Sequence, residues 1–308
     1  MLKKNILIFF FATYIFTAFG QLPTVARGKV VRIENFSSRY VSSRNVDVWL
    51  PPHYHPKQKY AVLYMHDGQM LYDANLTWNH QAWRVDSIAS RLMEKKATRP
   101  FIVVGIWNGG TTRHTDYFPQ KPFESLTPTQ RDTVCNQLQR SGRSIDRFQP
   151  QSDNYLRFLV KELKPYIDAH FATYRQASRT FIAGSSMGGL ISIYAVCEYP
   201  KVFGGAACLS THWPGTFTLS HNPMPEAFRQ YLRTHLPPAR THRFYFDCGD
   251  QTLDALYPEV QKSMDSLFSR RGYDRKHFQS RFFPGENHSE NAWKKRLSNP
   301  LEFLFRKK

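Results

Sequence analysis

The chain has 308 residues, enough for one large α/β domain or two smaller ones. Its 42 lysines and arginines outweigh 24 aspartates and glutamates, so the formal net charge is +18, which favours anionic neighbours such as acidic glycans, lipid headgroups or carboxylate substrates. The basic residues are scattered along the chain, so nucleic acid is not an expected partner. A basic surface that serves only solubility would explain the same balance.

Residues 1–20 predict a signal peptide. Lys3 and Lys4 precede an almost wholly apolar run over residues 6–19, and small residues stand at Ala18 and Gly20. The run is short for a membrane span, although an uncleaved anchor remains the alternative. We therefore expect a periplasmic or extracellular protein with no stable membrane insertion after cleavage. Its net charge would be +18 less the two lysines, or +16.

Residues 21–308 predict a single domain, because they contain no Gly/Ser linker, repeat or low-complexity tract. The four cysteines are too few for a disulfide framework, and most of them lie in apolar patterns where cysteine behaves as a small hydrophobe. No CxxC or HExxH spacing occurs, so we expect neither a metal site nor a cofactor. The cysteines are Cys135, Cys197, Cys208 and Cys248.

The first half of the domain alternates strand and helix patterns. Residues 30–34 and 39–50 predict an antiparallel pair of strands. Residues 59–65 and 101–106 are continuous apolar runs typical of buried strands, and residues 83–95 between them have helical spacing. Continuous apolar strands separated by helices predict a mostly parallel central sheet with helices on both faces.

Residues 119–151 carry little periodicity and many Gln, Arg, Ser and Pro residues. A long loop inside a compact domain is usually functional, so we expect an insertion over the site, with a disordered surface loop as the alternative. The α/β pattern then resumes. Helices are predicted over residues 154–170, 225–236, 257–271 and 291–306, and strands over residues 203–210, 242–248 and 277–283.

The strongest motif is Gly184-x-Ser186-x-Gly188, between an apolar strand pattern and a helical one. This is the nucleophile-elbow pattern in its required context. The turn holds the serine in a strained conformation. Side chains two residues before and two residues after it would collide with the neighbouring backbone, and glycine avoids this collision. The N–H of Met187 would lie at a helix N-terminus and could donate to an oxyanion. The alternative is a glycine-rich turn that serves packing only.

The chain also supplies the partners that an activated serine requires, an imidazole base and a carboxylate to orient it. His288 follows the last predicted strand, and Asp254 or Asp250 follows the strand before it. The order Ser, Asp, His is the one expected for an α/β-hydrolase sheet. Asp254 could instead be a helix N-cap, and Asp247, inside the strand, is the third choice for the acid.

A second oxyanion donor is expected from the loop after residues 59–65. Gly68 allows a close approach of the backbone, so the N–H of Gln69, or that of Gly68 itself, is the candidate. The alternative is a turn built around Gly68 with no catalytic role.

Three segments together, residues 64–73, 184–190 and 285–293, resemble the putative-esterase family of α/β-hydrolases. This family includes enterochelin (siderophore) esterases, feruloyl and acetylxylan esterases, and the esterase D group. The resemblance runs from about residue 39 to residue 304. It implies an α/β-hydrolase fold and a metal-free Ser-Asp-His site.

Carried over residue by residue, the resemblance implies Ser186 and His288, and it implies Asp254 through the pattern Gly249-x-x-x-Leu253-Asp254. The chain departs from the family in having Met70 where Asn is common and in its second acid, Asp250. We also expect no separate N-terminal domain like that of enterochelin esterases proper, which disfavours their substrate.

The sequence thus predicts a secreted serine carboxyl-ester hydrolase that works through an acyl-enzyme. The resemblance implies an ester of an acylated glycan or a siderophore-like ester as substrate, and the charge favours an anionic one. An acyltransferase or a peptidase shares the acyl-enzyme step and is the alternative. A second alternative is a binding module that performs no turnover.

Overall fold

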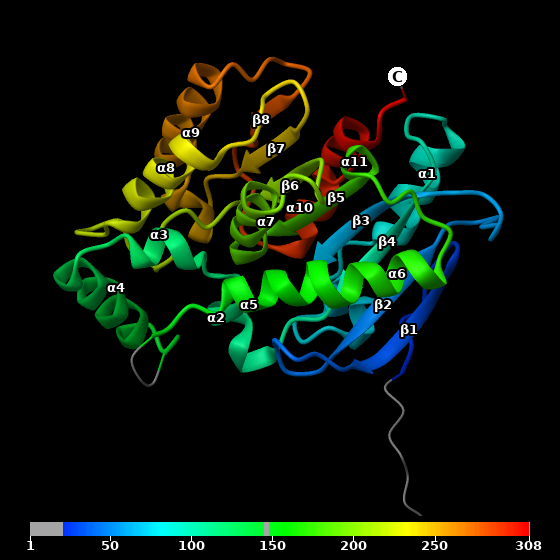
Figure 1. Ribbon diagram of the computed structural model, residues 1–308, viewed down its shortest axis with the longest axis horizontal. Coiled ribbons are helices and arrows are strands. Elements are labelled where there is room, and N and C mark those ends of the chain that lie inside the picture. The colour runs from blue at the N-terminus through cyan, green and yellow to red at the C-terminus, as the bar shows by residue number, and fades with distance from the viewer. Residues whose placement is uncertain (1–20, 145–147, 308) are drawn as a thin grey trace, which may run out of the picture.

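The computed structural model describes residues 21–144 and 148–307, so the predicted signal peptide lies outside the described residues. Its centre is an eight-stranded sheet with the order β1-β2-β4-β3-β5-β6-β7-β8 (Figure 1). The strands are β1 (Lys29–Phe36), β2 (Arg44–Leu50), β3 (Ala61–His66), β4 (Phe101–Ile106), β5 (Thr180–Ser185), β6 (Gly205–Leu209), β7 (Arg243–Cys248) and β8 (Phe278–Phe282).

Six neighbouring strands, β4-β3-β5-β6-β7-β8, are parallel, while β1 and β2 pair antiparallel at one edge. The predicted opening pair and the mostly parallel sheet are therefore confirmed. Since the parallel strands point the same way, the loops that follow them meet at one edge of the sheet. All the residues singled out in the sequence as candidate site residues lie in or beside these loops.

Helices cover both faces of the sheet. The first, larger core includes the inner sides of α5 to α9, and the second lies under α1, α10 and α11. The helices are α1 (Val85–Glu94), α2 (Arg113–Tyr117), α3 (Gln120–Glu124), α4 (Pro128–Arg140), α5 (Ser152–Arg157), α6 (Lys164–His170), α7 (Met187–Glu198), α8 (Met224–His235), α9 (Pro258–Arg270), α10 (Glu290–Arg296) and α11 (Ser298–Phe305).

The side chains of each buried strand alternate between the two cores. On β3, Val62 and Tyr64 face the first core, and Ala61, Leu63 and Met65 face the second. Alternate residues of a strand point to opposite faces, so a strand covered on both sides is apolar throughout. This is the physical reason that the continuous apolar runs of the sequence predicted the strands.

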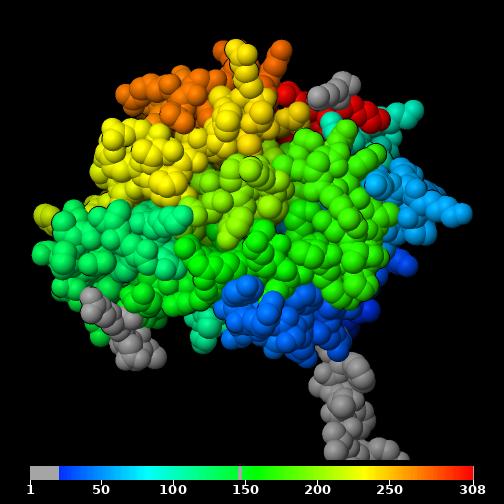
Figure 2. All heavy atoms as spheres, in the orientation of Figure 1, coloured from blue at the N-terminus to red at the C-terminus, as the bar shows by residue number. Residues whose placement is uncertain are grey.

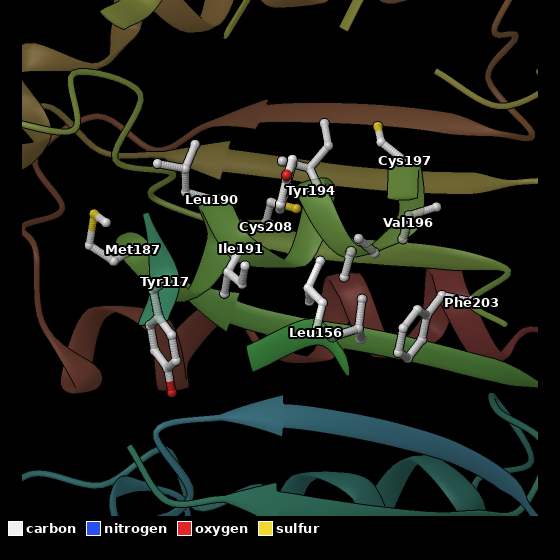
Figure 3. Packing of buried hydrophobic residues seen from close by; sticks show 14 of the residues in the cluster. Tyr117, Leu156, Met187, Leu190, Ile191, Tyr194, Val196, Cys197, Phe203 and Cys208 are labelled. Atoms are coloured by element: carbon white, nitrogen blue, oxygen red, sulfur yellow. The ribbon is translucent and has the colours of Figure 1, made fainter. Parts of the chain in front are cut away.

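Helix α7 is enclosed on all sides, and only its last residue, Glu198, is not buried. Figure 3 shows Leu190, Ile191 and Tyr194 of α7 pointing in different directions, and all three belong to the first core. A helix that is apolar all round is a core helix. Because α7 cannot shift within close packing, the serine at its N-terminus has a fixed position.

The prediction of an irregular insertion over residues 119–151 is wrong in its local structure, because α3 and α4 form there. Only Val134 and Leu138 of α4 are buried, which leaves almost no hydrophobic period to detect. A capping box between Thr127 and Gln130 marks the start of α4 and was available in the sequence. Figures 1 and 2 show α3 and α4 on the left side of the molecule.

Two predicted helices depart from regular α-helix near a proline, the first by a π-helical segment and the second by a break. The helix over residues 154–170 is α5 and α6 joined by a π-helical segment, Phe158–Leu163, just before Pro165. The C-terminal helix is α10 and α11. Pro300 has no N–H for the Arg296 carbonyl, which accepts instead from the Asn299 side chain at 3.1 Å.

Two further findings concern the described part of the chain. None of its helices has the length and hydropathy needed to cross a membrane. Cys197, Cys208 and Cys248 are buried free thiols, and Cys135 is partly buried.

Candidate active site

Ser186 lies at the sharp turn between β5 and α7. Its backbone has φ 58° and ψ −124°, a strained conformation for a residue with a side chain. Its N–H donates to the Leu209 carbonyl at 2.9 Å, and its carbonyl accepts from the His212 N–H at 3.2 Å. A Cβ on Gly184 would lie 2.7 Å from the carbonyl carbon of Gly188. The glycine at 184 is therefore required by the turn, as the sequence argument expected.

Asp254 and His288 meet across two loops at the carboxyl edge of the sheet. Asp254 belongs to the 3₁₀ turn Thr252–Leu256 after β7, and His288 follows β8. His288 Nδ1 lies 2.6 Å from Asp254 Oδ1, and the Asp254 side chain is 0% exposed. The carboxylate accepts, so Nδ1 carries the proton and Nε2 is left as the basic nitrogen.

The two other candidate acids have different partners. Asp250 Oδ1 accepts from the Gly285 N–H and from Gln251 Nε2, both at 2.8 Å. Asp247 is buried on β7, 3.0 Å from Arg296 Nη2. Of the three carboxylates, Asp254 is the one that contacts the imidazole, while Asp250 holds the loop that leads to His288.

The two candidate oxyanion donors lie in one cleft with Ser186. Met187 is the first residue of α7, where N–H groups have no partner within the helix. Gln69 lies in the 3₁₀ turn Gly68–Met70 after β3. A Cβ on Gly68 would come within 2.5 Å of the Gly105 backbone, so this glycine lets the turn press against β4.

The cleft has a volume of about 1120 Å³ and contains Ser186 and His288. Two of its lining residues are aromatic side chains that solvent reaches. Trp78 is 84% exposed, and Phe217 is 37% exposed. The Arg143 guanidinium lies 5.1 Å from the centroid of the Phe217 ring. The aromatic residues that line the cleft are Trp78, Trp83, Phe148, Phe217 and Trp293. Because Arg143 also lines it, the end of the 119–151 insertion does border the site.

An ion pair that the sequence argument missed supports the Gln69 loop. Arg113 donates to both carboxylate oxygens of Asp67, at 2.7 and 2.9 Å, and Asn108 Nδ2 adds a bond at 2.7 Å. Burial alone would raise the pKa of Asp67, but the Arg113 charge and these hydrogen bonds outweigh it and lower the pKa. Asp67 was considered only as part of a glycine turn, and no local pattern points to Arg113.

A histidine and a tyrosine beside Ser186 were also missed. The Tyr257 hydroxyl hydrogen-bonds His212 Nδ1 at 2.8 Å, and the His212 N–H donates to the Ser186 carbonyl at 3.2 Å. The Tyr257 ring meets the His288 ring edge-on, with centroids 5.8 Å apart. Burial raises the pKa of Tyr257 and lowers that of His212, so both side chains are neutral. The signal available was the polar run Ser210-Thr211-His212 directly after a buried strand.

Within residues 21–144 and 148–307, no group of three or more His, Cys, Asp or Glu side chains is placed to hold a metal ion. The groups that the cleft presents include a serine hydroxyl and an oriented imidazole.

An elbow serine that shares a cleft with an Asp–His pair, at the carboxyl edge of a mostly parallel sheet, is typical of the α/β-hydrolase fold. The chain belongs to the family described as "Putative esterase", whose model matches residues 37–304. The resemblance inferred from the three sequence segments is thereby confirmed.

Curated relatives are distant. YjcH of Bacillus subtilis (strain 168), an uncharacterized protein, is 22% identical over 178 residues, which is 58% of this chain and 59% of the relative. The carboxylesterase SOBER1 of Arabidopsis thaliana is 29% identical over 109 residues, or 33% of this chain and 45% of the relative. The chain thus spans 59% of YjcH and 61% of YbbA, a second Bacillus subtilis relative.

Three solved structures are similar over most of this chain. A ferulic acid esterase from Anaeromyces mucronatus has a TM-score of 0.61 at 17% identity and covers 92% of both chains. The enterobactin esterase FES from Shigella flexneri has a TM-score of 0.61 at 17% identity, over 92% of this chain and 60% of that chain. An IroE-like serine hydrolase from Shewanella oneidensis has a TM-score of 0.66 at 16% identity, over 90% and 80%. At such identities the likeness establishes the fold.

Proposed function

We propose that this protein is an exported serine carboxylesterase in which Ser186, Asp254 and His288 form the catalytic triad. The observation that carries the proposal is the 2.6 Å bond between Asp254 and His288, in the cleft that also holds the elbow serine. An Asp that accepts from Nδ1 stabilises the imidazolium which forms when Nε2 takes the serine proton. Membership of the esterase family supports the same assignment.

In the proposed reaction the Ser186 oxygen attacks the ester carbonyl carbon while its proton passes to His288 Nε2. The carbonyl oxygen becomes an oxyanion that the N–H groups of Met187 and Gln69 stabilise. The imidazolium then gives its proton to the departing alkoxide, which leaves an acyl-enzyme and a free alcohol. Water repeats the sequence on the acyl-enzyme, releasing the carboxylic acid and restoring Ser186.

The cleft supports a bulky substrate, either an acylated glycan or a siderophore-like ester. About 1120 Å³ is more than a small acyl group fills, and drug-sized ligands occupy clefts of this order. The aromatic side chains of the lining offer stacking surfaces, and Arg143 offers positive charge to an anionic ester. The structurally similar proteins are named for ferulic acid and for enterobactin, which agrees with both classes.

The test is a panel of acetyl, butyryl, feruloyl and trilactone esters, each assayed with the purified protein and with Ser186→Ala. We expect one of the bulky esters to give the highest kcat/KM and the variant to be inactive on all of them. Transfer of the acyl group to an added alcohol would identify an acyltransferase instead. Cleavage of the matching amides at a comparable rate would identify a peptidase, and no turnover of any compound would favour a binding module.

Export is tested separately. The apolar residues 6–19 and the basic residues before them support cleavage near Gln21. Expression of the full chain in a bacterium should give a periplasmic or secreted product whose N-terminal sequence begins at or near Gln21. A full-length product retained in the membrane fraction would contradict the proposal.

A further inference from the structure

The hydroxyl of Ser210, the residue that follows β6, uses all of its hydrogen-bonding capacity at the site. Its Oγ lies 2.6 Å from Asp254 Oδ2, 2.9 Å from Trp293 Nε1 and 2.8 Å from Arg296 Nη2. Indole and guanidinium nitrogens can only donate. Ser210 must therefore accept both of these bonds and give its single proton to Asp254.

The backbone of Ser210 is held in an unusual conformation. Its φ is 42°, a value that residues other than glycine seldom adopt, and the residue is 0% exposed. The Ser210 N–H donates to the Asp247 carbonyl at 2.8 Å, which fixes the turn against β7. Such strain persists where the surrounding structure holds it, and it is concentrated at functional sites.

This hydroxyl completes the set of contacts around the Asp254 carboxylate. Oδ1 accepts from His288, while Oδ2 accepts from Ser210 and from the Gly249 N–H at 2.7 Å. Because both oxygens are bonded, the carboxylate cannot rotate without breaking at least one of these hydrogen bonds. Hydrogen bonds to an ionised carboxylate are stronger than those between neutral groups. The oxygen that faces the imidazole is thereby fixed as Oδ1.

Ser210 also separates two buried charges. Arg296 Nη2 lies 3.0 Å from Asp247 Oδ1 but 3.9 Å from Asp254 Oδ2. Asp247 and Asp254 are both 0% exposed and Arg296 is 2% exposed. The attraction of the Arg296 guanidinium for each carboxylate is therefore only weakly screened. A direct Arg296–Asp254 pair would compete with His288 for the carboxylate. The Ser210 hydroxyl bonds to both groups and lies between them.

We propose that Ser210 is a positioning residue, whose hydroxyl holds Asp254 toward His288 and keeps it from pairing directly with Arg296. Its effect on turnover rests on the proposed esterase function. Its effect on the hydrogen bond between Asp254 and His288 rests on the geometry alone, and this effect can be measured without a substrate.

The experiment compares Ser210→Ala, Ser210→Gly and the control Thr211→Val with the parent protein. Both Ser210 variants lose the hydroxyl, but glycine also accepts the positive φ without strain. Thr211 is the neighbouring residue, is 1% exposed, and its hydroxyl bonds only to the Cys208 carbonyl among the hydrogen bonds described. Each protein is assayed for kcat and KM, for melting temperature, and for the far-downfield proton resonance of His288 Nδ1, identified by its loss in His288→Asn.

We expect both Ser210 variants to lose about 10–100-fold in kcat with KM within about twofold, the size of effect that follows from losing a hydrogen bond to a charged group. The Nδ1 resonance should move upfield in both, and Thr211→Val should match the parent. Recovery of kcat and of the resonance in Ser210→Gly would show that only the backbone strain matters and would overturn the proposal, as would an equal loss in Thr211→Val. If the parent hydrolyses no ester but the resonance shifts as expected, the esterase assignment fails and the positioning role stands.

Discussion

At the scale of single residues, the environment separates three aspartates that lie within eight positions of one another. Asp247 is paired with Arg296, Asp250 accepts from the Gly285 N–H, and Asp254 accepts from His288. A carboxylate can orient the imidazole only through direct contact, because the orientation depends on one hydrogen bond. The geometry therefore favours Asp254 over Asp250, the acid that the sequence had left as an alternative.

Exchange of each carboxylate for an amide tests this choice. Asp254→Asn should lower kcat by about 10²–10³-fold, because an amide cannot stabilise the imidazolium in the same way. Asp250→Asn keeps the shape of a group that only supports a loop, so its loss should stay under about tenfold. Both are measured as kcat on one ester, with the melting temperature as the folding control. A larger loss in Asp250→Asn would refute the assignment of Asp254.

The residues of the site differ in how far the sequence could reveal them. Ser186 and His288 were accessible because an elbow motif and the position after a strand are local features. Asp254 was left open against Asp250, since the loop conformation that turns one of them toward the imidazole is not encoded in a short pattern. Tyr257 and Arg113 had no local signal, and the polar run after β6 pointed to Ser210 only as one of three polar residues. The roles of all three residues arise from contacts between segments far apart in the chain.

At the scale of elements, the turn between β5 and α7 sets a steric requirement at one glycine and not at the other. A Cβ on Gly184 would meet the Gly188 backbone at 2.7 to 2.9 Å, closer than real Cβ contacts. A Cβ on Gly188 would lie 3.4 Å from the His66 Cβ, an ordinary contact. The two glycines of the motif are therefore not equivalent.

Alanine at each of these positions should separate them. Gly184→Ala forces one backbone away from another, so it should lower the free energy of unfolding by roughly 1–3 kcal/mol and reduce activity by displacing Ser186. Gly188→Ala should be near neutral in stability, since alanine also favours the helix. The measurement is urea unfolding of both variants. Equal destabilisation by the two changes would contradict this account of the turn.

Element prediction succeeded and failed for physical reasons. The strands were found because burial on both faces makes them apolar throughout, a pattern that survives without an alignment. Helix α4 was missed because it buries only two residues and has almost no period, so its capping box was the one usable signal. The π-helical segment before Pro165 and the break before Pro300 were readable in principle, since proline removes a backbone donor.

At the scale of the whole molecule, buried neutral groups make stability depend on pH. Burial lowers the pKa of His66 from 6.5 to about 3, and its Nδ1 bonds to the Tyr155 hydroxyl at 2.8 Å. The unfolded chain takes up a proton at this histidine below pH 6.5, whereas the folded chain does not until about pH 3. Its contribution to stability is therefore full above pH 6.5 and is lost as the pH falls toward 3.

His66→Gln removes this titration and should flatten the acid limb of the stability profile. The expected change in slope is about 1.4 kcal/mol per pH unit between roughly pH 6 and pH 4. Free energies of unfolding from urea titrations at several pH values give the slope, and the exposed His170→Gln is the matched control, expected to leave it unchanged. An unaltered slope in His66→Gln would show that His66 does not remain neutral in the folded protein.

The whole account depends on Ser186 being the nucleophile that His288 activates, and covalent labelling measures this most directly. The protein is treated with a fluorophosphonate, which reacts with activated serines, and the modified peptide is located by mass spectrometry. We predict one adduct, on Ser186, with labelling at least about 10²-fold slower in His288→Ala. Labelling of another residue, or an unchanged rate in His288→Ala, would contradict the proposed triad.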